Sequence, residues 1–137
     1  MAALPRVALI FTGGTIDSVG ADRLDLAWYI EHGKRLDDGE LVGRVPELAS
    51  IARVEEVPFR RLTSQSIGDA DLLALVETIH RLFQEDRADG IVITHGTNTL
   101  EETAYFLHLT LKTDRPVVII GSMRPSSGLS ADGDLPR

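Results

Sequence analysis

Residues 93–104 read ITHGTNTLEETA, a short apolar run that stops at a glycine and then passes through polar residues into an acidic segment. The run from Ile91 to Thr94 has the continuous β-branched content of a strand that is buried on both faces of a parallel sheet. Thr99 and Glu102 have the spacing of a capping box, which predicts a helix through the following AYFLHLTL. The stretch therefore predicts a strand, a turn and a helix, which is the repeating unit of an α/β fold.

The same alternation extends to both sides of this unit. In residues 69–90, leucine, isoleucine and valine recur at three- and four-residue spacing, Asp69 or Asp71 is placed to cap the start, and Gly90 marks the exit. The order of elements favours an α/β fold with a doubly wound, mainly parallel sheet and helices on both faces. The expected strands lie at 7–11, 53–59, 91–94 and 117–121, the expected helices lie at 46–52, within 69–90 and at 104–111, and a long loop with a hairpin or one helical turn spans 16–45.

Composition narrows the class of protein. A chain of 137 residues with 43% hydrophobic content is predicted to form one globular domain with a core. Its 14 Lys and Arg against 21 Asp and Glu give a net charge of −7, which argues against nucleic acid or an anionic membrane as the main partner. The absence of cysteine excludes disulfides, thiolate metal sites and a cysteine nucleophile, and it fits a reducing compartment, so we expect a cytoplasmic protein. The apolar run at 7–11 is too short for a signal-peptide core or a membrane span.

Two expected strands end in similar turns that carry a threonine, IFTGGT at 10–15 and ITHGT at 93–97. Loops at the carboxyl ends of parallel strands form the ligand crevice of such sheets, so Thr15 and Thr97 are placed to face each other there. On these residues alone, each threonine is also compatible with a helix cap or a turn. Gly13 and Gly14 likewise admit two interpretations, a tight turn or a close approach of a ligand to the backbone. The TGGT spacing does not match a nucleotide fingerprint.

Four blocks of sequence together resemble the bacterial-type L-asparaginase and glutaminase-asparaginase family: FTGGTI at 11–16, TSQ at 63–65, ITHGTNTLEETAYFL at 93–107 and GSMRPSSGLSADG at 121–133. The resemblance extends from Val7 to the end of the sequence and identifies residues 1–137 as an asparaginase-type amino-terminal domain. It implies an amidohydrolase that releases ammonia from the side chain of asparagine, sometimes glutamine, through a covalent acyl-threonine intermediate. It also implies that no metal or organic cofactor is needed and that the protein is a homo-oligomer.

The resemblance implies roles for particular residues. Thr15 of TGGTI resembles the primary nucleophile, and Thr97 of HGTNT resembles the second active-site threonine. Tyr29 lies in the long loop, where the family has a mobile lid with a tyrosine that orients the nucleophile. Threonine is a weak nucleophile that needs such a neighbour, and main-chain N–H groups beside the two threonines are expected to stabilise the tetrahedral intermediate. The residues that resemble substrate-binding positions are Gly14, Ser64, Gln65, Gly96, Asn98 and Ser122.

His95 stands beside Gly96, where a general base would be attractive. The family does not use this histidine catalytically, so we expect a structural imidazole that is bonded to the backbone. Met123, Arg124 and Pro125, which follow Ser122, are expected to shape a turn.

Position 98 departs from the family pattern, because the family has aspartate there and this chain has asparagine. The resemblance implies that the aspartate serves the substrate ammonium and a lysine that forms a triad-like relay with Thr97. Asparagine preserves the shape and one acceptor oxygen but loses the charge. Hydrogen bonds to charged partners contribute about 1.5–3 kcal/mol, and in a serine protease triad the analogous change lowers turnover by about 10⁴. If both roles apply here, we expect severely reduced activity.

The length of the sequence is a second departure. In the family, the relay lysine and a smaller carboxyl-terminal domain, which completes the site of a neighbouring subunit, would follow Arg137. Lys34 and Lys112 are poor substitutes for that lysine. We therefore expect an incomplete amino-terminal domain whose sheet keeps an uncovered face or edge and which depends on self-association.

Two further hypotheses stay open. A non-catalytic amino-acid-binding or regulatory module of the same fold would keep the crevice and lose the relay, and Asn98 favours this alternative. An asparaginase-like subunit of a transfer-RNA-dependent amidotransferase would pass ammonia to a partner enzyme. Such subunits carry an extra amino-terminal domain, whereas this sequence starts at its first expected strand, which counts against the second alternative.

Overall fold

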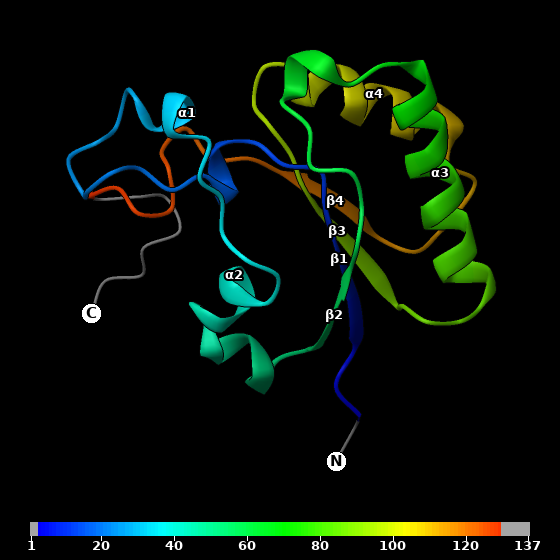
Figure 1. The fold of residues 1–137 in the computed structure, drawn as a ribbon. Coiled ribbons are helices and arrows are strands. Elements are labelled where there is room, and N and C mark those ends of the chain that lie inside the picture. Colours follow the sequence, from blue (N-terminus) through cyan, green and yellow to red (C-terminus); the bar gives the residue numbers. More distant parts are fainter. Residues whose placement is uncertain (1–2, 130–137) are drawn as a thin grey trace.

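The computed structural model describes residues 3–129, which fold around a four-stranded sheet (Figure 1). All pairings in the sheet are parallel, and the strands lie in the order β2-β1-β3-β4. The predicted parallel α/β architecture is therefore confirmed. The strands are β1 (Arg6–Phe11), β2 (Arg53–Val57), β3 (Gly90–Thr94) and β4 (Val117–Ile120).

One face of the sheet is covered by α3 (Asp69–Gln84) and α4 (Leu100–Thr110), which Figure 1 shows together on that side. Leu75, Ile79 and Leu82 are buried on α3 at the three- and four-residue spacing that the sequence predicts. Burial of this apolar surface is the main force that holds the helices on the sheet. The other buried members of this core are Ala8, Ile10, Val57, Ala88, Ile91, Ile93 and Leu107.

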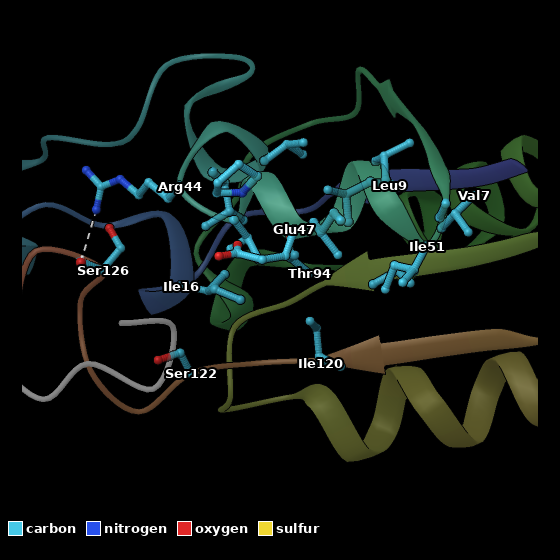
Figure 2. A pocket seen from close by; sticks show the side chains of 18 residues that line it. Val7, Leu9, Ile16, Arg44, Glu47, Ile51, Thr94, Ile120, Ser122 and Ser126 are labelled. Carbon is cyan, nitrogen blue, oxygen red and sulfur yellow. Dashed lines mark hydrogen bonds between the residues drawn. The ribbon is translucent and has the colours of Figure 1, made fainter. Parts of the chain in front are cut away.

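The opposite face of the sheet is covered only in part. Two short elements, α2 (Glu40–Gly43) and the 3-10 helix η2 (Pro46–Ser50), lie over this face and leave an apolar groove of about 900 Å³ along the sheet (Figure 2). On β4, Val118 is 49% exposed and Ile120 is 40% exposed. The expectation of an uncovered face is confirmed for the part of the chain that the structure describes.

The long segment between β1 and η2 contains short helices and a hairpin-like pairing, as predicted. The 3-10 helix η1 (Thr15–Asp17) follows β1 directly, and α1 (Tyr29–His32) lies farther along. Ser18 and Arg35 form an isolated antiparallel bridge that closes the segment between them. Residues 19–34, between these two bridge residues, are called the lid segment below.

The amino-terminal end of α3 is capped by Asp71, whose carboxylate accepts the Gly68 N–H at 3.2 Å. A carboxylate in the first turn also interacts favourably with the helix dipole. Of the two predicted caps, Asp71 rather than Asp69 makes this contact. The helix has 16 residues, and no helix within residues 3–129 is long and apolar enough to cross a membrane.

Two local predictions are wrong. Thr99 stands directly before α4, but its hydroxyl donates to the Ser64 carbonyl oxygen at 2.9 Å and does not cap the helix. The Thr99 oxygen accepts no N–H group of the first turn of α4, so the capping box with Glu102 does not form. β2 ends at Val57 and not at residue 59, since the proline at position 58 has no N–H to continue the ladder.

The core predicts a clear difference between two positions on α3. Ile79 is 0% exposed, so Ile79→Ala should lower the free energy of unfolding by about 2–5 kcal/mol through lost burial and a residual cavity. Leu73 is 57% exposed, so Leu73→Ala is the matched control and should cost less than about 1 kcal/mol. Denaturant unfolding followed by circular dichroism measures both values. Equal losses in the two variants would contradict this core.

Candidate active site

The candidate site forms at the point where the winding of the sheet reverses. β1 connects to β2 on one side, whereas β3 connects to β4 on the other side, so the switch point lies between the carboxyl ends of β1 and β3. Thr12 N–H donates to Thr94 O at 3.1 Å and keeps the chain paired just beyond β1. The turns that follow these two strands carry Thr15 and Thr97.

Two glycines allow these turns to approach each other closely. Gly14 has a φ of +108°, and a Cβ at this position would lie 2.5 Å from the Gly96 Cα. A Cβ on Gly96 would lie 2.7 Å from the Ser64 Cβ. Both distances are too short for real carbon atoms, so glycine is required at each position. The contact brings together three segments that are far apart in the sequence.

A cavity of about 410 Å³ opens beside this contact. It is bordered by the turns after β1 and β3, by the lid segment and by the 3-10 helix η3 (Ser64–Ser66). Every residue that the sequence assigned to catalysis or substrate binding, except Ser122, lines this cavity. These residues are Gly14, Thr15, Tyr29, Ser64, Gln65, Gly96, Thr97 and Asn98.

The lid segment brings a tyrosine hydroxyl to the first threonine. Thr15 Oγ1 and Tyr29 Oη lie 3.1 Å apart, within hydrogen-bonding distance. Tyr29 is only 9% exposed, so its ring is held in the fold although the residues around it are exposed. This geometry suits an orienting role for Tyr29, because either hydroxyl can donate to the other.

The segment between β2 and α3 contributes the polar residues Ser64 and Gln65. Ser64 is buried and its carbonyl oxygen accepts the Thr99 hydroxyl, which ties this segment to the turn before α4. Gln65 and Asn98 are exposed and border the cavity. The cavity therefore presents hydroxyl and amide groups, which can orient a small polar ligand.

Ser122 lies outside this cavity. It is 5% exposed, lines the apolar groove on the open face of the sheet (Figure 2), and its hydroxyl donates to the Arg124 carbonyl oxygen at 2.7 Å. The neighbouring Met123, which was expected only to shape a turn, lines the candidate site instead. The chain bends at Met123 and Arg124, directly beyond β4, and the two adjacent side chains line different hollows there.

His95 is a fully buried residue at the end of β3. Its Nδ1 lies 2.7 Å from the Gly96 carbonyl oxygen, and its Nε2 lies 3.0 Å from Thr103 Oγ1 on α4. Because a carbonyl oxygen only accepts, Nδ1 carries the proton and Nε2 accepts from the threonine. Burial lowers the pKa of His95, which favours this neutral form. The expected structural imidazole bonded to the backbone is confirmed.

Sequence reasoning set Lys34 aside as a poor relay lysine and missed Arg35, yet both cationic residues lie near the site. Lys34 and Arg35 line the cavity from the end of the lid segment, and Arg35 pairs with the buried Asp17. Asp17 follows Thr15 by two residues, and a charged residue so close to a buried strand was the available signal. Within residues 3–129, no group of three or more His, Asp or Glu side chains could hold a metal ion.

Comparison with known proteins shows the family of this chain. A model of the family described as Asparaginase, N-terminal matches residues 6–135. The chain therefore belongs to the asparaginase family and corresponds to its amino-terminal domain.

Individual members of the family are similar over nearly the whole chain. The chain is 45% identical over 132 residues to a glutaminase-asparaginase of Pseudomonas fluorescens biotype A, covering 96% of this chain and 36% of that protein. It is 46% identical over 130 residues to L-asparaginase 2 of Bacillus subtilis, covering 95% of this chain and 34% of that protein. The crystal structure of a probable cytoplasmic L-asparaginase from Campylobacter jejuni matches with a TM-score of 0.87 and 41% identity, over 95% of this chain and 38% of that one. The chain thus spans about a third of the length of the curated relatives it matches.

The neutral His95 predicts a pH dependence of stability. In the folded state the pKa of His95 lies below its ordinary value, whereas in the unfolded chain it lies near that value of 6.5. Protons therefore favour the unfolded state as the pH falls below about 6.5, and stability is lost there by up to about 1.4 kcal/mol per pH unit. In His95→Gln this contribution should disappear, whereas His108→Gln, at an exposed position of α4, should keep it. Denaturant unfolding between about pH 7 and pH 5 tests this, and an unchanged pH profile in His95→Gln would contradict it.

Proposed function

We propose that this chain supplies the nucleophile-bearing domain of an amidohydrolase that converts L-asparagine to L-aspartate and ammonia through an acyl-threonine intermediate. The observation that carries the proposal is the pair of hydroxyls on Thr15 and Tyr29, 3.1 Å apart at the cavity. Family membership supports the same class of reaction, because the relatives named above are called L-asparaginase and glutaminase-asparaginase.

In the proposed reaction, Thr15 Oγ1 attacks the side-chain amide carbon of asparagine while Tyr29 orients it. The hydroxyl proton is transferred to the amide nitrogen, the C–N bond breaks, and ammonia leaves. An aspartyl ester of Thr15 remains. Water then attacks the ester carbon, its proton returns to the Thr15 oxygen, and aspartate is released.

Substrate binding in this proposal uses the polar residues of the cavity. Ser64 and Gln65 would hold the α-carboxylate and α-amino groups, and Thr97 would act as the second active-site threonine. Gly14 and Gly96 would give the substrate access to the backbone. The same proposal includes a relay lysine and a partner subunit in a homo-oligomer. It also includes a cytoplasmic location and any use of glutamine as a substrate.

Asn98 favours a second candidate function, a non-catalytic amino-acid-binding or regulatory module. No aspartate or glutamate is among the described residues that line the cavity. An ammonium group bound there would therefore meet the neutral amide of Asn98 rather than a carboxylate. A hydrogen bond from ammonium to an amide oxygen is weaker than one to a carboxylate, because the attraction between two opposite charges is missing, and the same loss would weaken a catalytic relay.

The role of Thr15 is tested by Thr15→Ala in the protein expressed from its complete reading frame. Loss of the nucleophile should lower kcat/KM for asparagine by at least about 10³-fold, measured by ammonia release. Thr78→Ala is the matched control, because Thr78 lies on α3 and its hydroxyl donates to the Ala74 carbonyl of its own helix. Full activity in Thr15→Ala, or no ammonia release from the unaltered protein, would refute the proposal.

The role of the charge missing at position 98 is tested by Asn98→Asp. Restoring a carboxylate should raise kcat/KM for asparagine by at least about tenfold, because hydrogen bonds to a charged group are stronger. Asn98→Gln is the control, since it changes the side chain without restoring the charge. An unchanged kcat/KM in Asn98→Asp would contradict the prediction.

Calorimetry with asparagine and aspartate separates the two candidate functions in the unaltered protein. Binding of either amino acid without release of ammonia would favour the non-catalytic module, whereas turnover would exclude it.

A further inference from the structure

A buried ion pair lies at the base of the lid segment. Asp17 is 1% exposed, and its Oδ1 accepts a hydrogen bond from Arg35 Nη1 at 2.6 Å. Its second oxygen, Oδ2, has no hydrogen-bond partner among residues 3–129. Asp17 precedes the lid segment and Arg35 follows it, so the pair joins the two points at which this segment leaves the rest of the domain.

Backbone hydrogen bonds form a short antiparallel stem around the same pair. Val19 N–H donates to Lys34 O at 2.9 Å, and Leu36 N–H donates to Asp17 O at 2.8 Å. These bonds flank the isolated bridge that closes the lid segment. So short a two-stranded stem is only marginally stable without further contacts.

Arg61 anchors one side of the stem to the domain. Its guanidinium donates to the Leu36 carbonyl oxygen at 2.6 Å and pairs with Asp38. It also stands over the Phe11 ring, 5.5 Å from the centroid, which fixes it to the end of β1. Its positive charge acts on Asp17 as well and favours the ionised carboxylate.

The ionised form of Asp17 does not favour the folded state over the unfolded state. Burial raises the pKa of Asp17 above its ordinary value, although Arg35 and Arg61 act to lower it. A raised pKa contributes stability that is fully present below the unfolded pKa and is lost as the pH rises through the folded pKa. Replacing a buried ion pair with neutral side chains is often neutral or stabilising. Global stability therefore does not account for the pair.

We propose that the Asp17–Arg35 pair is a positioning element that fixes the lid segment against the domain and so holds Tyr29 at hydrogen-bonding distance from Thr15. Thr15 lies on the domain side of the stem, in η1, and Tyr29 lies within the lid segment. Their hydroxyls meet only if the stem keeps one arrangement. The ion pair selects that arrangement, because its geometry is directional and the backbone bridge alone is weak.

Trp28 reports on the lid segment directly, because it is the only tryptophan of the chain and precedes Tyr29. Three variants test the pair. Asp17→Asn removes the negative charge, Arg35→Met removes the positive charge, and the double variant removes both. Time-resolved fluorescence anisotropy follows the motion of Trp28. We expect the nanosecond component to grow at least about twofold in each single variant. The melting temperature of the double variant, which leaves neither charge unpaired, should stay within about 3 °C of the unaltered protein.

Three comparisons make this test decisive. Arg87→Gln is the matched control, because it removes an arginine–carboxylate pair with Glu55 outside the lid segment and should leave the decay unchanged. The double variant should be no more mobile than the single variants, because all remove the same interaction. An unchanged decay in both single variants would overturn the proposal. A fall in the melting temperature of the double variant with loss of far-ultraviolet circular dichroism would also overturn it, since the pair would then stabilise the whole domain.

A kinetic readout rests on the proposed function. In the protein expressed from its complete reading frame, Arg35→Met should lower kcat for ammonia release by about 10- to 100-fold, because the Thr15 hydroxyl loses its orientation. KM should change by less than about threefold, since the pair acts on the nucleophile. If the unaltered protein releases no ammonia, the proposed function fails while the Trp28 decay still decides the role of the pair. If the unaltered protein is active and the decay does not change, only the role of the pair fails.

Discussion

The close approach of two turns, at Gly14 after β1 and Gly96 after β3, is the constraint on which the rest of the site depends. A side chain at either position would occupy the space of the other turn or of Ser64. Because backbone meets backbone there, Thr15 and Thr97 follow on neighbouring turns and border one cavity. The parallel sheet supplies this proximity, since the pairing of β1 with β3 aligns their carboxyl ends.

Two buried titratable groups stand beside this contact and differ in how burial is compensated. His95 satisfies both ring nitrogens, one with the Gly96 carbonyl and the other with Thr103, so a neutral imidazole fits the interior. Within residues 3–129, Asp17 has a hydrogen-bond partner for one of its two oxygens, and burial raises its pKa. A buried carboxylate that does not stabilise the fold is expected where a residue serves a function. The position of Asp17 at the base of the lid segment agrees with this expectation.

Much of the fold could be predicted from local pattern, because β1, β3 and β4 contain continuous apolar runs and α3 has regular spacing. Predictions from local pattern were wrong where a side chain bonds a distant segment instead of a neighbouring one. Thr99 has the sequence context of a helix cap, yet its hydroxyl bonds the Ser64 carbonyl. Ser122 and Met123 exchange their expected places, because a motif names adjacent residues without saying which side of the chain each one faces. The resemblance to a family located the remaining cavity residues, which residue types alone left open.

The sequence by itself determined the strands, the longest helix, the parallel α/β class and the turns that carry Thr15 and Thr97. These features depend on hydrophobic periodicity and on glycine, which act over a few residues. Only the tertiary structure decided that Tyr29 reaches Thr15, that Ser122 lies outside the cavity, and that Asp17 pairs with Arg35 across the lid segment. Each of these depends on which segments meet in space, and hydrogen bonding and burial between distant segments are not written in local spacing.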